Sequence, residues 1–196
     1  MAKGETLLQD NIHEPNRWFP GSATGRMNGK CLQPEEPLLR PLAQDDVSTI
    51  ESWPDYPTEF QELNYALRKD GWLAEFGRRP DTWLYAAEQA GQVIAFTILA
   101  TSAPDEAEFR IALRADKSGQ GLGRVITNHT LTKAFGECGL SRVHLIVRKN
   151  NRRAIELYRR LGFTHRGECR KTIDNQLTDF LSMDLGPRQW LAISEG

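Results

Sequence analysis

The sequence lacks the bulk features that mark membrane proteins and proteins that coat nucleic acid. Its 25 basic and 26 acidic residues nearly cancel over 196 residues, so no charge excess points to nucleic acid. The longest apolar run, Val93–Ala100, is far shorter than the roughly 20 residues of a membrane helix. The amino terminus lacks the basic-then-apolar order of a secretory signal. We therefore expect a cytoplasmic globular protein that binds neither nucleic acid nor membrane.

Cysteine and histidine are scarce, and their spacing indicates neither a disulfide framework nor a metal site. The three cysteines are odd in number and irregularly spaced, which is typical of reduced thiols in the cytosol. The four histidines show no metal-ligand spacing among themselves or with the cysteines. We predict no metal, and structural roles for His129 and His144. The residues concerned are Cys31, Cys138, Cys169, His13, His129, His144 and His165.

The hydrophobic periodicity begins only after the first 36 residues. Residues 1–36 are rich in Gly, Pro, Asn and Glu and show no helical or strand period, which predicts an irregular amino-terminal extension. Residues 37–187 are long enough for one domain with a substantial core. Residues 188–196 are assigned to a carboxyl-terminal tail.

The first part of this domain reads as a short strand near Leu38 and a helix that begins near Gln44. Apolar residues at helical spacing follow, with Thr58 and Gln61 as a capping box. Gly71 is expected to divide this region into two helices.

The rest of the domain alternates strands with helices. Residues 82–89, 92–103 and 106–115 have the period of two that predicts an antiparallel meander. A helix up to Gly139, a strand, a second helix and a closing hairpin then follow, at residues 124–139, 142–150, 151–163 and 163–185. The order β-α-α-β-β-β-α-β-α-β-β predicts an α/β or α+β fold. It has a mixed, mostly antiparallel sheet of six to seven strands, flanked by about four helices.

Three glycines at alternate positions stand between the third meander strand and the next helix, in the stretch Ser118–Arg124. A glycine turn before a helix N-terminus exposes backbone amides to an anion. No Gly-Lys-Ser/Thr ends the stretch, so it is not a phosphate-binding P-loop. It is one residue short of a dinucleotide fingerprint, although Arg148 and Lys149 would suit a 2′-phosphate. A tight turn without a ligand is the third alternative.

Two motifs together resemble the GNAT superfamily of acyl-CoA-dependent N-acetyltransferases. The first is the glycine turn, and the second is an Asn-x-x-Ala-x-x-Leu-Tyr segment followed by Leu-Gly-Phe. The matching residues are Gly121, Gly123, Asn151, Ala154, Leu157, Tyr158, Leu161, Gly162 and Phe163. The resemblance spans residues 38–185, and the ending is similar to that of the ribosomal-protein and polyamine branch. Ser118 departs from the family's Arg or Gln, and Arg124 could supply part of the missing charge.

The resemblance implies a binding site for acetyl-CoA, the expected cosubstrate. The backbone amides of Gly119, Gln120, Gly121, Leu122, Gly123 and Arg124 would hold the pyrophosphate. Ile111, Ala112 and Leu113 would pair with the pantetheine arm like a further strand, and the Leu113 amide would polarise the thioester carbonyl. Asn151 would bond the pantetheine, cap the following helix, or do both.

The resemblance also implies catalytic groups. Tyr158 occupies the position of the acid that protonates the leaving thiolate, although its ring alone could be a packing residue. Some relatives carry a glutamate base where this chain has Ile146, so Glu108 is the candidate base, with Glu106 in reserve. Strand alternation places Glu108 opposite Phe109, which favours a solvated glutamate unless a bulge redirects it. A chain of water molecules is the alternative.

The acceptor is expected to be a primary amine on a protein amino terminus, a lysine or a small molecule. Residues 53–80, which in this family line the acceptor groove, contain a local acidic excess that suits a cationic amine. A catalytically silent acyl-CoA sensor and a dinucleotide-binding protein are the alternative functions. Oligomerisation is left open, with a homodimer as the candidate assembly.

Overall fold

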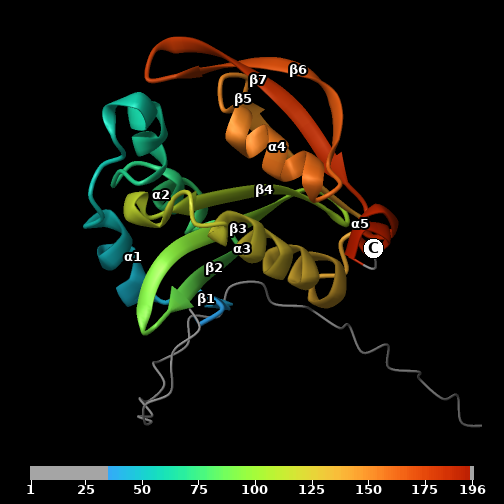
Figure 1. Cartoon of the computed structure of the whole chain (residues 1–196), viewed down its shortest axis with the longest axis horizontal. Helices are drawn as coiled ribbons and strands as arrows, with labels where there is room; N and C mark the ends of the chain where they lie inside the picture. Colours follow the sequence, from blue (N-terminus) through green and yellow to red (C-terminus); the bar gives the residue numbers. More distant parts are fainter. Residues whose placement is uncertain (1–34, 195–196) are drawn as a thin grey trace, which may run out of the picture.

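The computed structural model describes residues 35–194, which contain one seven-stranded sheet with helices on both faces (Figure 1). The predicted extension therefore lies almost wholly outside the described residues, as does Cys31. The sheet order is β1-β2-β3-β4-β5-β7-β6. Only β4 and β5 pair in parallel, which confirms the predicted mixed, mostly antiparallel sheet.

The strands are β1 (Leu38–Pro41), β2 (Thr82–Gln89), β3 (Gln92–Ala103), β4 (Glu106–Leu113), β5 (Arg142–Arg148), β6 (Thr164–Ile173) and β7 (Gln176–Leu185). The helices are α1 (Gln44–Glu51), α2 (Trp72–Phe76), α3 (Leu122–Thr132), α4 (Arg152–Arg160) and α5 (Pro187–Ser194). Two 3₁₀ segments, η1 (Thr58–Ala66) and η2 (Ala115–Lys117), and a π-helical segment, η3 (Lys133–Glu137), complete the order.

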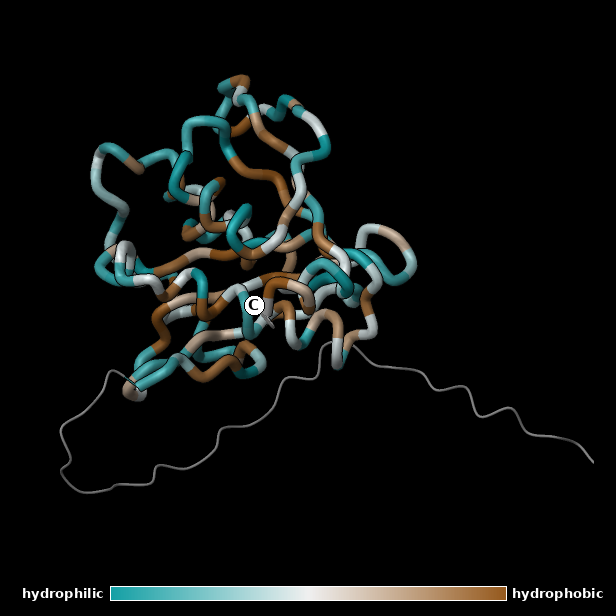
Figure 2. The backbone as a smooth tube through the Cα atoms, turned by 45° about the vertical axis from the view of Figure 1, so that its right-hand side comes forward, coloured by the Kyte–Doolittle hydropathy of each residue, from teal (hydrophilic) through white to brown (hydrophobic). Residues whose placement is uncertain are grey.

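Each face of the sheet buries its own hydrophobic cluster. We call the side covered by α3, α4 and α5 the α4 face; its cluster includes Phe109, Ile126 and Tyr158. The side covered by α1, η1 and α2 is the α1 face, with Ile50 and Phe96 in its core. Figure 2 shows hydrophobic segments gathered in the central strands and hydrophilic ones along the outer loops. Because side chains alternate along a strand, the central strands contribute to both clusters.

Tight turns predicted from the sequence are present. Ala90–Gly91 and Asp174–Asn175 each place two consecutive residues at positive φ, the backbone that two-residue hairpins require. Gly139 has a φ of 65° and follows the π-helical end of the long helix. It therefore ends that helix, as predicted.

Two local expectations were wrong. Thr58 does not cap a helix, because Pro57 holds the cap position without a side-chain hydrogen bond and the segment is 3₁₀-helical. The stretch assigned to a tail forms α5, whose Trp190 packs against the α4-face cluster. Gly162 has a φ of 93°, and a Cβ built there would lie 2.6 Å from Ile193 Cδ1 of α5. Glycine at this position therefore permits α5 to dock.

Asp46 fixes the start of α1 through three hydrogen bonds to its carboxylate. Arg40 donates from Nη1 to Oδ2 at 2.6 Å and from Nη2 to Oδ1 at 3.0 Å, and the Ala43 amide donates to Oδ2 at 2.7 Å. Burial alone would raise the pKa of Asp46, but these hydrogen bonds outweigh it and hold the pKa below its usual value. The carboxylate therefore stabilises the folded chain above its unfolded pKa of about 3.9.

Replacing Asp46 by asparagine is expected to lower the free energy of unfolding at pH 7 by about 1–3 kcal/mol. The deficit should persist down to about pH 5 and shrink as the pH falls through the lowered folded pKa, because the wild-type carboxylate is then protonated. Urea unfolding across this pH range measures it. Asp45→Asn, an exposed acid in the same helical turn, is the control. A deficit that did not vary with pH would contradict the prediction.

Candidate active site

The sheet opens between β4 and β5. Their parallel pairing joins only Glu106–Glu108 to Arg142–His144, although β4 continues to Leu113 and β5 to Arg148. The other edge of β5 pairs with β7 as far as Arg148. Residues 109–113 and 145–148 therefore border an opening, which we call the wedge. Figure 1 shows the two halves of the sheet on either side of it.

The backbone of β4 presents alternate peptide groups to the wedge. The Arg114 amide donates to the Ile94 carbonyl of β3 at 2.8 Å, and antiparallel pairs alternate in hydrogen bonding. Ala112, opposite Phe96, therefore directs its peptide groups to β3, whereas Ile111 and Leu113 direct theirs into the wedge. Of the three residues expected to pair with a pantetheine arm, Ile111 and Leu113 have the required orientation.

Tyr56 contacts this edge from the segment between α1 and η1. Its hydroxyl donates to the Leu113 carbonyl, and its own amide donates to Asn64 Oδ1 at 2.8 Å. Burial raises the pKa of Tyr56 to about 12, partly offset by that carbonyl contact, so the phenol stays a hydrogen-bond donor at neutral pH. Sequence reasoning missed Tyr56, because nothing local to position 56 indicates a partner 57 residues away.

The glycine turn leaves a run of amides free at the start of α3. Gly119 and Gly121 have φ values of 89° and 80°, a backbone that favours glycine. The amides of residues 119–123 have no acceptor within the described part of the chain. The Arg124 amide donates to the Gly121 carbonyl at 3.0 Å. Five of the six predicted amides, those of Gly119, Gln120, Gly121, Leu122 and Gly123, are therefore open to an anion.

The surroundings of the turn also suit an anion. Gln120 Nε2 donates to the Asp116 carbonyl at 2.8 Å and braces the loop. No atom lies within 4 Å of a Cβ built at Gly121, and Arg153 Nη2 lies 3.1 Å from one built at Gly119. The turn thus combines free amides, open space and a guanidinium, the chemistry that binds phosphate.

Asn151 caps α4, as one of its expected roles required. Its Oδ1 accepts from the Ala154 amide at 3.1 Å. Its side-chain nitrogen has no hydrogen-bond partner among residues 35–194. That nitrogen can donate to a ligand while the cap stays in place.

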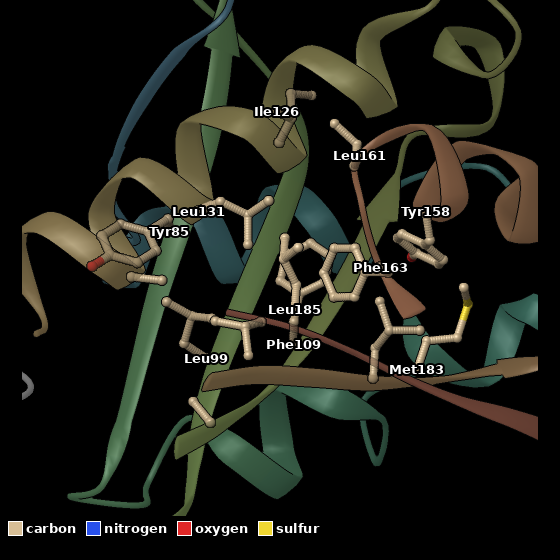
Figure 3. Close-up of a cluster of buried hydrophobic side chains, with 14 of the residues drawn as sticks. Tyr85, Leu99, Phe109, Ile126, Leu131, Tyr158, Leu161, Phe163, Met183 and Leu185 are labelled. Atoms are coloured by element: carbon tan, nitrogen blue, oxygen red, sulfur yellow. The ribbon is translucent and has the colours of Figure 1, made fainter. Parts of the chain in front are cut away.

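Tyr158 lies on the buried side of α4, beside the narrow end of the wedge. Its ring contacts Phe109 at 6.4 Å and Phe163 at 5.5 Å between centroids, both edge to face (Figure 3). Phe109 is the first β4 residue beyond the last pair with β5. Burial raises the pKa of Tyr158 above its usual value of 10, because an ionised phenol is poorly solvated there. The phenol therefore remains protonated at neutral pH.

Glu108 is paired rather than solvated. Arg110 Nη2 lies 2.8 Å from Glu108 Oε1, and the Arg110 guanidinium stacks over Trp72 and Phe76 at 5.1 and 4.8 Å. The strand alternation predicted for Glu108 holds, since Phe109 belongs to the α4-face cluster. The reserve candidate Glu106 forms an ion pair with Arg142 at 2.8 Å.

His144 lies next to Glu108 in the sheet register. Its Nε2 is 2.8 Å from Ser102 Oγ. Burial lowers the pKa of His144, although Glu108 opposes this, so the imidazole is neutral at pH 7. Glu108 and His144 are thus neighbours at the narrow end of the wedge, and His144 is hydrogen-bonded to the exposed Ser102.

Arg148 points away from the cofactor turn. A dinucleotide at the turn would place Arg148 beside a 2′-phosphate, but its guanidinium lies over Tyr65 and Phe180 on the α1 face, at 5.8 and 5.7 Å. Its Nη2 donates to the Glu62 carbonyl of η1 at 3.2 Å. The alternation along β5 explains this, because Val147 packs in the α4-face cluster.

Residues 35–194 hold no group of three or more His, Cys, Asp or Glu side chains that could bind a metal ion. None of the helices described has the length and apolar character needed to span a membrane.

Comparison with known proteins identifies a family. Residues 47–163 match the model of the acetyltransferase (GNAT) family. Spermidine N(1)-acetyltransferase of Escherichia coli K12 is 29% identical over 167 residues, which cover 79% of this chain and 88% of that enzyme.

Solved structures share the fold. Spermidine N-acetyltransferase from Vibrio cholerae in complex with CoA and spermine superposes with a TM-score of 0.67 at 20% identity, over 80% of this chain and 98% of that one. A dodecameric structure of the Vibrio cholerae enzyme gives a TM-score of 0.63 at 22% identity, over 80% and 96% of the two chains. At this identity the likeness establishes the fold alone.

Proposed function

Because the chain belongs to the acetyltransferase (GNAT) family and is an N-acetyltransferase that uses acetyl-CoA, we propose that it acetylates the primary amino group of a small molecule by direct transfer. The observation that carries this proposal is the combination of five free amides at residues 119–123 with the open edge of β4. The curated relatives are named for a small amine, which favours a small molecule over a protein amino terminus or lysine. The family match favours acetyl-CoA over a dinucleotide at the turn.

In this mechanism the two substrates bind on opposite faces of the sheet. The amides of residues 119–123 hold the pyrophosphate on the α4 face, where Leu157 of α4 lies 3.5 Å from a Cβ built at Gly123. The pantetheine arm follows Ile111 and Leu113 along the wedge, and its thioester carbonyl accepts from the Leu113 amide. The acceptor approaches from the α1 face, between residues 53–80 and β5. Its amine and the thioester carbon then meet in the wedge.

The transfer needs two proton movements. The amine nitrogen attacks the thioester carbon, the C–S bond breaks, and the departing sulfur takes a proton from the Tyr158 phenol. Solvent then reprotonates the phenolate. The amine gives up its own proton through Glu108 or through water beside Glu108 and His144. Because Arg110 pairs with Glu108, the water route is the one that leaves this ion pair intact.

Calorimetric titration of the purified chain with acetyl-CoA, followed by a thiol-release assay with a panel of primary amines, tests the proposal. We expect micromolar acetyl-CoA binding and amine-dependent thiol release, with acetylated product identified by mass spectrometry. NADPH, the dinucleotide alternative, should give no heat. If neither acetyl-CoA nor coenzyme A bound, the proposed cofactor site would be wrong. If acetyl-CoA bound but no amine were acetylated, the small-molecule acceptor would be wrong.

A further inference from the structure

Arg148 is a half-buried cation with no carboxylate partner. None of the ion pairs formed among residues 35–194 includes it, although Arg110 across the wedge and Arg142 on its own strand are both paired. Its Nε is fully buried and lacks a hydrogen-bond acceptor. Its remaining hydrogen bonds are long and go to neutral oxygens, at 3.2 Å to the Glu62 carbonyl and 3.4 Å to Thr178 Oγ1. The Glu62 carboxylate accepts from Asn150 instead, at 3.3 Å.

An unpaired guanidinium in such a position is costly unless a ligand completes it. Removing a charge from water costs several kcal/mol, which a counter-ion with good geometry offsets. Arginine is suited to this task, because its planar fork of N–H donors matches a carboxylate and its flat faces stack on aromatic rings. Arg148 already has the stacking partners, Tyr65 and Phe180. The fork lacks only the anion.

Arg148 also stands where the acceptor must enter. The Arg148 guanidinium on β5 lies over the Tyr65 ring at 5.8 Å, and the Arg110 guanidinium on β4 lies over the neighbouring Trp72 ring at 5.1 Å. These two rings therefore link the two borders of the wedge on the α1 face. Tyr65 contacts Trp72 edge to face at 5.6 Å. Nearby, Tyr56 reaches the Leu113 carbonyl, close to the amide assigned to the thioester. The acceptor entrance is therefore aromatic.

The charge of this entrance opposes a polycation. Arg110 and Glu108 neutralise each other, and Arg148 leaves an excess positive charge. Of the acidic residues that suggested a cationic amine in the sequence, residues 55, 59, 70 and 75 are exposed. The fifth, Glu62, is half-buried, and its carboxylate accepts from Asn150 rather than pairing with Arg148. Two cations in a medium of low dielectric repel each other strongly. An acceptor with a second ammonium group would thus face a guanidinium that forms no ion pair among residues 35–194, because the nearby Glu62 carboxylate is bound to Asn150.

We propose that the acceptor is a primary amine that carries a carboxylate, which Arg148 binds at the mouth of the wedge while the amine reaches toward Leu113. This inference rests on the proposed function and names the substrate class of the same site. It separates the chain from the polyamine specificity named for its relatives.

The test uses three acceptors that share a primary amine on a four-carbon chain: γ-aminobutyrate, its neutral amide and putrescine. Thiol release from acetyl-CoA by the full chain gives kcat and KM for each. We expect kcat/KM for γ-aminobutyrate to exceed that for putrescine at least about tenfold, the value of one charge-assisted hydrogen bond. Longer and shorter amino acids locate the best spacing.

Arg148→Gln then assigns the effect to this side chain. It should lower kcat/KM for the best carboxylate acceptor about 10–100-fold, mostly through KM, and leave the neutral amide nearly unchanged. Arg148→Lys should restore part of the loss. Arg188→Gln removes a charge from an exposed arginine of α5, outside the wedge and the acceptor segment, and should have no effect.

Two outcomes would overturn this inference and leave the proposed function standing. One is a wild-type preference for putrescine or spermidine over every amino acid tested, a comparison that needs no variant to fold. The other is an equal loss by Arg148→Gln on charged and neutral acceptors. By contrast, absence of acetyl-CoA binding, or of turnover with any amine, would overturn the proposed function and this inference with it.

Discussion

Replacing Tyr158 by phenylalanine is expected to lower kcat by about 10²–10³-fold while leaving acetyl-CoA affinity unchanged. A positioned general acid contributes on this order, and the leaving thiolate of coenzyme A has no other phenol assigned to it. Tyr158 makes no hydrogen bond within the described residues, and phenylalanine keeps the contacts with Phe109 and Phe163. Stability should therefore change by less than about 1 kcal/mol.

The measurement is thiol release at saturating acetyl-CoA, with the dissociation constant from calorimetry. Tyr85→Phe is the matched control, because Tyr85 is also a buried tyrosine of the α4-face cluster. Within residues 35–194 its hydroxyl has one hydrogen-bond partner, the Cys138 sulfur at 3.7 Å. It should retain full turnover. If Tyr158→Phe retained it as well, the assignment of the acid would be wrong.

The pH dependence of kcat is a second test of Tyr158 as the acid. Because burial raises the pKa of Tyr158, its proton is present throughout the range in which an unperturbed tyrosine begins to ionise, near pH 10. The wild-type kcat should therefore show no descending alkaline limb up to at least about pH 10. A limb centred near pH 8 or 9 would mean that a different acid protonates the thiolate.

Local patterns predicted the parts of the fold that local physics decides. The alternation of Phe109, Ile111 and Leu113 placed their side chains on one face, and the structure packs all three with the α4-face cluster. Gly139 ended its helix because a positive φ there suits glycine. Asn151 capped α4 for a comparable reason, since its short side chain reaches the Ala154 amide.

The rest depended on contacts between distant segments. The wedge exists because β4 and β5 stop pairing at Glu108 and His144, a register that neither strand's own sequence specifies. Helix α5 docks on Gly162, which precedes it by 25 positions. The nine residues 188–196 have no clear hydrophobic period, so their sequence did not predict this helix. The ion pair that occupies Glu108 comes from Arg110 on the same strand, but two open aromatic faces on α2 decide where that arginine lies.

Arg148 shows that contacts between distant segments also decide what a functional residue does. Its position at the end of a strand, beside Lys149, suggested a contact with the 2′-phosphate of a dinucleotide. Strand alternation alone places Arg148 and Val147 on opposite faces, and the packing of Val147 in the α4-face cluster identifies which face each takes. The residue type thus indicated a site for an anion. Which anion we propose there depends on how η1, β5 and β7 are arranged around the guanidinium.

Replacing Gly121 by valine is expected to weaken acetyl-CoA binding by on the order of 10²–10³-fold. A valine at a φ of 80° is strained, and its side chain would fill the open space before the amides. Losing two or three amide–phosphate hydrogen bonds, at about 1.5 kcal/mol each, accounts for this range. Calorimetry with acetyl-CoA measures it directly.

The control for this variant is Gly139→Val at the far end of the same helical run. Gly139 also has a positive φ, 65°, and open space around a built Cβ, so valine there carries the same kind of backbone strain. About 16 helical residues separate the two sites, roughly 24 Å at 1.5 Å per residue, so strain at Gly139 cannot block the turn. Both variants should lose a similar amount of stability, about 1–2 kcal/mol, while only Gly121→Val loses affinity. If the two lost affinity equally, general destabilisation would explain the result, and the amides of residues 119–123 would not be the pyrophosphate site.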